Sequence, residues 1–166
     1  MKTIYNFSAG PAVLHHSVIR STANAANNFN NSGMSLMEMS HRSKPVVDMV
    51  NETEELSREL LHIPKEFEVL FLQGGASLQF SMIPMNLLIK NAVADYTDTG
   101  SWSYKALNQA KLFGKVNIAS SSRTSNYSFI PKEINQSSGS IYLHITSNNT
   151  IYGTQWKEFP KPLNSS

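Results

Sequence analysis

Apolar positions recur at helical spacing through residues 45–62 of the chain. Polar and charged residues fill the positions between them, so one face of the predicted helix is apolar and expected to be buried. Pro64 follows closely and cannot continue a helix, which sets the predicted end near His62. The apolar positions are Val46, Val50, Leu56, Leu60 and Leu61.

The hydrophobic pattern changes near Glu68, where short apolar runs begin to alternate with longer amphipathic ones. Strands that alternate with helices are typical of parallel βαβ units, which predicts an α/β fold with a mostly parallel sheet flanked by helices. Ligands are then expected at the carboxyl ends of the strands. The predicted strands are 67–73, 91–100, 115–121 and 140–150, and the predicted helices are 11–26, 45–62, 76–88 and 102–114. Gly114 is expected to cap the last of these helices.

Composition narrows the possible functions. A net charge of +2 is too small to indicate a nucleic-acid or membrane-surface partner, and no apolar run approaches the ~18 residues of a membrane span. The chain has no cysteine, which excludes a disulfide, a thiolate zinc site and a thiol nucleophile. The N-terminal sequence MKTIYNFSAGP lacks the apolar core of a secretory signal, so we expect a cytoplasmic protein.

The sequence LQGGASLQF, residues 72–80, places two glycines between a predicted strand and a predicted helix. Free N–H groups and the positive end of the helix dipole meet at such a turn, so Gly75, Ala76 and Ser77 are candidates to bind a phosphate. The alternative is a tight turn in which Ser77 only caps the helix. A Walker A loop and a full dinucleotide fingerprint are absent, although Asp95, about twenty residues later, keeps a nucleotide-binding domain open.

Trp102 and Thr150 are expected at the same edge of the sheet, because both lie where predicted strands end. The Trp102 indole could stack on a flat ring and the Thr150 hydroxyl could bind the same ligand, although a core tryptophan is the more common role. His41 and Arg42 lie in a polar loop and could bind a carboxylate or phosphate, or form only a solvated surface pair. Together these features fit a phosphorylated aromatic cofactor, and pyridoxal phosphate is one.

The remaining titratable residues predict neither a metal site nor an acid–base pair. His15 and His16 are neighbours on a predicted helix and point apart, so they are not expected to share a metal ion. The glutamates of residues 45–62 belong to the solvated face of that helix.

Five blocks of sequence lie between residues 4 and 156: YNFSAGPAVL, MEMSHRSK, VLFLQGGASLQFSMIPMNLL, DYTDTGSWSYKA and HITSNNTIYGTQ. In sequence, order and spacing they resemble the phosphoserine aminotransferase family. The resemblance implies a homodimeric pyridoxal-phosphate transaminase of the aspartate-aminotransferase fold (fold type I). It also implies transfer of an amino group from L-glutamate to 3-phosphohydroxypyruvate in serine biosynthesis, and in some bacteria a role in the route to pyridoxal phosphate.

The same resemblance implies a role for each candidate residue. Gly75, Ala76 and Ser77 would hold the cofactor phosphate, with Ser77 in a position where many relatives have an arginine. Trp102 would stack on the pyridine ring and Thr150 would bind the cofactor beside it. His41 and Arg42 would contact the acidic end of the substrate. Residues 1–44 would form an N-terminal loop and helix segment, and residues 45–166 part of the large cofactor-binding domain.

The family's chain is about twice as long as this one. Its aspartate that pairs with the pyridine nitrogen and its Gln-Lys pair, whose lysine forms the Schiff base, have no counterpart here, so no catalytic residue is assigned. Two hypotheses follow: the N-terminal part of a working transaminase, or a truncated ligand-binding or interaction module without catalysis. In either case the 166 residues alone are predicted not to transaminate.

Overall fold

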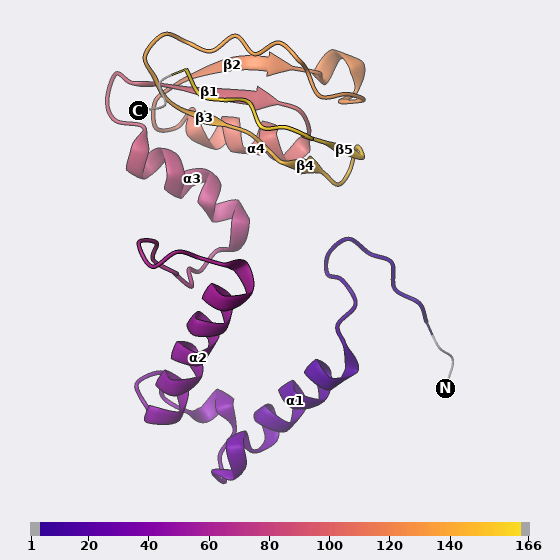
Figure 1. Ribbon diagram of the computed structural model, residues 1–166, viewed down its shortest axis with the longest axis vertical. Coiled ribbons are helices and arrows are strands. Elements are labelled where there is room, and N and C mark those ends of the chain that lie inside the picture. The colour runs from indigo at the N-terminus through magenta and orange to yellow at the C-terminus, as the bar shows by residue number, and fades with distance from the viewer. Residues whose placement is uncertain (1–3, 164–166) are drawn as a thin grey trace. The chain divides into compact units, whose positions relative to one another are not determined.

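The computed structural model describes residues 4–163 of the chain. These residues form two compact units, one that ends at Phe71 and one that begins at Leu72 (Figure 1). The first unit contains the helices α1 and α2, and the second contains α3, α4 and all the described strands. The boundary at residues 44 and 45 stays a prediction.

Residues 4–15 of the first unit lie outside any helix or strand. Helix α1 (His16–Asn27) starts later than the predicted residue 11, and the His15 side chain caps it by accepting a hydrogen bond from the Ser17 N–H at 3.4 Å. Two short 3₁₀ turns follow, η1 (Phe29–Asn31) and η2 (Leu36–Glu38). In η2 the Ser35 side chain accepts a hydrogen bond from the backbone of Glu38, and the Glu38 side chain accepts one from the backbone of Ser35. Together these two bonds form a complete capping box.

Helix α2 (Lys44–Leu61) confirms the helix predicted from the apolar spacing. Pro45 lies in its first turn, where a missing N–H breaks no helical bond, and His62 ends it in the left-handed conformation with φ 52°. Arg58 donates to Glu54 at 2.9 Å and to the Phe67 carbonyl at 2.8 Å, so it ties the following segment to the helix.

The apolar stripe of α2 is more exposed than predicted. Only Val46 is buried among its described residues, whereas Leu60 and Leu61 are 75% and 72% exposed. The spacing therefore predicted the helix correctly, but the first unit supplies little surface to cover its apolar face.

The second unit is an α/β structure built on a three-stranded parallel sheet in the order β2-β1-β3. Its elements are α3 (Gly75–Leu87), β1 (Val93–Asp98), α4 (Ser101–Ala110), β2 (Lys115–Ser121) and β3 (Ser140–His144). A small antiparallel pair, β4 (Asn148–Asn149) with β5 (Thr154–Gln155), follows β3. The predicted fold class, a mostly parallel sheet flanked by helices, is confirmed for this unit.

Helix α4 packs on the central strand β1, and α3 packs against α4. The core contains residues of β1 and α4 together with Leu88, and its Ala residues on α4 allow the helix to approach the strand closely. It consists of Leu88, Ala94, Tyr96, Ala106, Leu107 and Ala110. Because β1 lies between two partners, it is buried from Ala94 to its end at Asp98.

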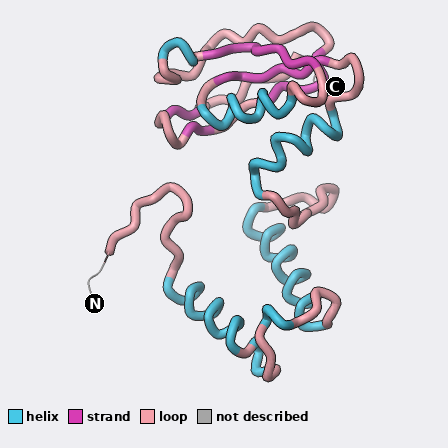
Figure 2. The backbone as a smooth tube through the Cα atoms, turned by 180° about the vertical axis from the view of Figure 1, so that it is seen from behind, coloured by secondary structure: helices cyan, strands magenta, loops and turns pink. Residues whose placement is uncertain are grey.

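The strand predicted at residues 67–73 is wrong. These residues form turns and loop before α3 (Figure 2). Leu70, Phe71 and Leu72 are 71%, 58% and 53% exposed, and no described strand pairs with them. An apolar run of this length fits a strand only where a neighbouring strand takes its backbone hydrogen bonds.

Two further boundaries differ from the prediction. The strand predicted at 140–150 is divided into β3 and β4 by a loop. Helix α4 ends at Ala110 rather than at Gly114, which is not in the left-handed conformation of a helix cap. Gly114 serves close packing instead, because a Cβ there would lie 2.7 Å from Cγ of Leu88.

Candidate functional site

One cavity of about 380 Å³ brings together the N-terminal ends of α3 and α4. Four of the residues predicted to contact a cofactor lie on it: Gly75, Ala76, Ser77 and Trp102. Gly74 and Phe80 complete its lining, and none of the six side chains carries a charge. The predicted grouping of the glycine turn with the tryptophan is therefore present, although no strand precedes the glycines.

The glycines set the start of α3. Gly74 and Gly75 have φ values of +85° and +58°, which residues other than glycine rarely adopt. No side chain caps the helix, and the Ser77 hydroxyl has no hydrogen bond among the described residues. The interpretation of Ser77 as a plain helix cap is thus wrong for this structure. The first N–H groups of α3 have no helical acceptor and lie at the positive end of the helix dipole, which is an arrangement that favours an anion.

Space at the turn also suits a ligand. A Cβ built on Gly75 would meet nothing within 4 Å, so this backbone is open rather than packed against protein. A Cβ on Gly74 would overlap the Leu78 side chain, so a residue larger than glycine does not fit at position 74 without a shift of Leu78.

Trp102 is the second residue of α4, and its side chain is 36% exposed. The Lys105 ammonium lies 4.5 Å from the centre of its ring, which is a cation–π contact. Lys105 does not line the cavity, so the indole has a cation on one part of its surface and the cavity on another.

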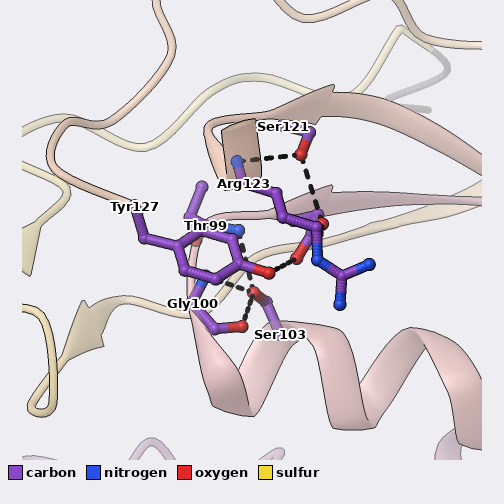
Figure 3. Close-up of polar contacts among 7 residues, drawn as sticks. Thr99, Gly100, Ser103, Ser121, Arg123 and Tyr127 are labelled. Atoms are coloured by element: carbon purple, nitrogen blue, oxygen red, sulfur yellow. Dashed lines mark hydrogen bonds and ion pairs between the residues drawn. The ribbon is translucent and has the colours of Figure 1, made fainter. Parts of the chain in front are cut away.

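Ser103 fixes the turn that leads into α4 (Figure 3). Its buried hydroxyl accepts hydrogen bonds from the N–H groups of Thr99 and Gly100 at 2.8 and 2.9 Å, and donates to the Gly100 carbonyl at 2.9 Å. A Cβ on Gly100 would overlap the Asn149 side chain, so glycine is required there for space. The start of α4 is thereby packed against the β4–β5 pair.

Asp98 forms the centre of a cluster that the sequence did not reveal. Its partners Ser121, Arg123 and Tyr127 are labelled in Figure 3. Its carboxylate accepts hydrogen bonds from the Tyr127 hydroxyl at 3.0 Å and from the Ser121 hydroxyl at 3.2 Å, and Nε of Arg123 lies 3.9 Å away. The Arg123 guanidinium stacks 3.6 Å from the centre of the Tyr104 ring on α4. A carboxylate at the end of a buried strand was the one signal for this cluster in the sequence.

The pKa shifts follow these contacts. Burial, and then the hydrogen bond to Asp98, raises the pKa of Tyr127. The contact with Arg123 lowers the pKa of Tyr104. Tyr127 is therefore a neutral hydroxyl that donates to Asp98 near neutral pH.

The other predicted site residues lie outside the cavity lining. Thr150 is exposed in the turn after β4 and follows Asn149, which packs on Gly100. His41 and Arg42 belong to the first unit, in an exposed turn just before α2. Neither of their side chains makes a hydrogen bond or ion pair with another described residue.

The nucleotide-binding alternative loses its supporting carboxylate. Asp95 is fully buried, and its two oxygens accept hydrogen bonds from the Asn117 side chain at 2.8 Å and the Ser137 N–H at 2.9 Å. It therefore holds β1 to β2 and to the following loop, and is not available to a ribose hydroxyl.

Comparison with known proteins assigns the fold to a family. The sequence profile described as Aminotransferase class-V matches residues 4–163. The chain belongs to the class-V aminotransferase family. The phosphoserine aminotransferase of Halalkalibacterium halodurans is 51% identical over 162 residues, which is 96% of this chain and 45% of that protein.

Solved structures of phosphoserine aminotransferases agree with this class-V assignment. One, determined in a study of radiation damage of the Schiff base, matches with a TM-score of 0.89 and 49% identity over 96% of this chain and 45% of its own. The pyridoxal-phosphate-bound enzyme of Trichomonas vaginalis matches with a TM-score of 0.86 and 38% identity over 95% and 48%. The resemblance seen in the five sequence blocks is thus confirmed.

The matched region is a part of those proteins. The chain spans about 45% of the length of the curated relatives it matches. Within residues 4–163, no helix is long and apolar enough to cross a membrane. The same residues contain no group of three acidic or histidine side chains placed to hold a metal ion.

Proposed function

We propose that the chain forms the phosphate and ring-stacking side of a pyridoxal-phosphate site in a phosphoserine aminotransferase. The reaction is amino transfer from L-glutamate to 3-phosphohydroxypyruvate, a step of serine biosynthesis, and the protein is expected to act as a cytoplasmic homodimer. The observation that carries this proposal is the cavity shared by the uncapped start of α3 and Trp102.

The cavity residues fit the two chemical parts of this cofactor. A phosphate dianion matches the free N–H groups of Gly75, Ala76 and Ser77 and the positive end of the α3 dipole, and the Ser77 hydroxyl can add a donor. The neutral lining leaves those N–H groups as the main source of positive potential. Trp102 offers a flat apolar face on which a pyridine ring can stack.

When bound, pyridoxal phosphate supplies an electron sink for the bonds around the carbon that carries the amino group. The residues of this chain would hold the phosphate at α3, orient the ring against Trp102 and exclude water from that face. Thr150 would add a hydrogen bond at the cofactor, and His41 with Arg42 would bind the acidic end of the substrate in a charge-assisted contact.

A second candidate is a ligand-binding module without catalysis. The observation that favours it is the lack of any Gln-Lys dipeptide in the 166 residues. No lysine lines the cavity, and the Lys105 ammonium lies over the Trp102 ring outside the lining. An amine without fixed placement forgoes the effective molarity that positioning provides, about 10⁵–10⁸ M.

The two candidates are separated by binding and turnover measured together. Pyridoxine 5′-phosphate, which lacks the aldehyde and cannot bond covalently to lysines, should bind the 166-residue chain, and Trp102→Ala should weaken that binding by about tenfold. Trp156→Phe serves as the control, because Trp156 lies outside the cavity. Absence of binding by the unaltered chain would contradict the proposed site.

Turnover is tested with pyridoxal phosphate, glutamate and 3-phosphohydroxypyruvate. The 166-residue chain is expected to form no stoichiometric borohydride-trapped adduct at one lysine and no phosphoserine. An intact mass of the protein from its natural source would show whether it is longer. Turnover by a longer natural protein supports the transaminase, and a natural protein that binds the cofactor without turnover supports the module.

A further inference from the structure

The Trp102 indole makes no hydrogen bond to another described residue. It is 36% exposed, and the Lys105 ammonium lies 4.5 Å from the centre of its ring. The position of the ring therefore depends on the backbone of the turn from Asp98 to Trp102, on the placement of α4 and on the packing around the indole. Whatever holds that turn also holds the wall of the cavity.

The Asp98 cluster holds the turn on the side where β1 ends. The Asp98 carboxylate is 3% exposed and receives hydroxyl hydrogen bonds from Tyr127 and Ser121. Its backbone carbonyl also accepts a hydrogen bond from the Ser122 N–H at 3.1 Å. These three bonds join the last residue of β1 to the 121–127 segment, which begins with the last residue of β2.

A second contact joins the same segment to α4 beyond Trp102. Arg123 lies with Nε 3.9 Å from the Asp98 carboxylate and stacks its guanidinium 3.6 Å from the centre of the Tyr104 ring. The 121–127 segment therefore contacts the chain at Asp98 and at Tyr104, which lie on either side of Trp102 in the sequence. Between them, Ser103 closes the turn with its three hydrogen bonds.

We propose that Asp98, through Tyr127 and Ser121, is a positioning residue that fixes the Trp102 indole against the cavity. The identity of the ring that Trp102 would stack on rests on the proposed function, whereas the positioning of the indole does not. Loss of the Tyr127 hydroxyl leaves a buried carboxylate oxygen without its hydrogen-bond donor, which costs free energy. Movement of the adjoining turn would lower that cost by giving the oxygen a new partner. The cluster thus controls how well the cavity wall is preorganised.

Tyr127→Phe is the sharpest variant, because it removes one hydroxyl and keeps the ring that packs 4.8 Å from the Tyr152 ring. The chain has two tryptophans, so 5-fluorotryptophan gives two ¹⁹F resonances that Trp102→Phe assigns. Tyr127→Phe should shift and broaden the Trp102 resonance and leave that of Trp156 in place. Tyr142→Phe is the matched control, because it removes a hydroxyl from the Tyr96–Tyr142 pair at 2.9 Å, away from this cluster.

Substitution at Asp98 itself extends the test. Asp98→Asn keeps an oxygen that accepts from Tyr127 and should retain the Trp102 resonance, whereas Asp98→Ala should broaden it. An unchanged Trp102 resonance in folded Tyr127→Phe and Asp98→Ala chains would overturn the proposal. Equal changes at Trp102 and Trp156 would overturn it too, because they would indicate general loosening.

Ligand binding separates this proposal from the proposed function. Tyr127→Phe should weaken pyridoxine 5′-phosphate by about fivefold, the factor for about 1 kcal/mol, and leave inorganic phosphate unchanged, because phosphate alone needs α3 and not Trp102. If the unaltered chain binds neither probe, the proposed function fails while the ¹⁹F result still decides the role of Asp98. Equal weakening of both probes would contradict a role confined to Trp102.

Discussion

The two units of the chain achieve their order in different ways. In the first unit the helices form with few buried side chains: α1 has none and α2 has only Val46 among the described residues. In the second unit the central strand is buried from Ala94 to Asp98, and buried residues continue into the turn before α4. A helix satisfies its backbone hydrogen bonds within its own segment, whereas β1 is buried because it has neighbouring strands on both sides.

Amide hydrogen exchange should show the largest difference between the units. Exchange in β1 requires the core of the second unit to open, whereas α1 has no buried residue to protect it. We expect amides of β1 to exchange at least about a hundredfold more slowly than those of α1, as measured by mass spectrometry. Similar protection in both elements would mean that the first unit is held as firmly as the second.

A pair of leucine substitutions tests the same contrast energetically. Leu107 is fully buried in the core of the second unit, so Leu107→Ala should cost about 2–5 kcal/mol in the free energy of unfolding. Leu60 on α2 is 75% exposed, and Leu60→Ala should change that free energy by less than about 0.5 kcal/mol. Urea denaturation provides the measurement, and equal effects would contradict the division into a packed and a sparsely packed unit.

The pH dependence of the second unit should reflect His144. Burial lowers its pKa to about 4, below the ordinary value of 6.5, so the unfolded chain binds a proton more readily than the folded one. Stability should therefore fall by about 1–3 kcal/mol as the pH drops from about 6.5 to about 4, and level off below that range. Denaturation across this range measures the slope.

His144→Phe provides the control for this pH effect. The phenyl ring can keep the stacking on Tyr96, for which the ring centres are now 4.7 Å apart, but it does not titrate. The slope between about pH 4 and 6.5 should become shallower in this variant. A slope that stays the same would show that another group causes the acid sensitivity.

The smallest expected effect concerns glycines in the left-handed conformation. Gly75 has φ +58° and open space around it, so Gly75→Ala should destabilise the second unit by about 1 kcal/mol through backbone strain alone. Gly33 in the first unit has φ +79° and equally open surroundings. Gly33→Ala should leave the unfolding transition of the second unit unchanged, as followed by Trp156 fluorescence. A shift with both variants would show that the units unfold together.

The sequence predicted those features that depend on local pattern. Residues 45–62 and 115–121 match α2 and β2 closely, because spacing and β-branched content decide such elements. It failed at residues 67–73, where the apolar run has no partner strand among the described residues. Whether such a run pairs depends on distant residues, which no local pattern reports.

The residues of the candidate site likewise fall into those that a local sequence pattern predicts and those that only the fold brings together. The glycine turn of α3 and Trp102 carry local signals, and they meet at one cavity as predicted. The bonds from Tyr127 and Ser121 to Asp98 join positions far apart in the sequence, and neither residue type is unusual in a loop. Only the fold shows that these hydroxyls meet a buried carboxylate beside the tryptophan turn.

A crystal structure of the chain with pyridoxal phosphate would show directly whether this cavity is the cofactor site. We expect the phosphate within hydrogen-bond distance of the N–H groups of Gly75, Ala76 and Ser77, and the pyridine ring stacked on Trp102. A phosphate bound elsewhere, or a ring that does not contact Trp102, would contradict the assignment of this cavity as the cofactor site.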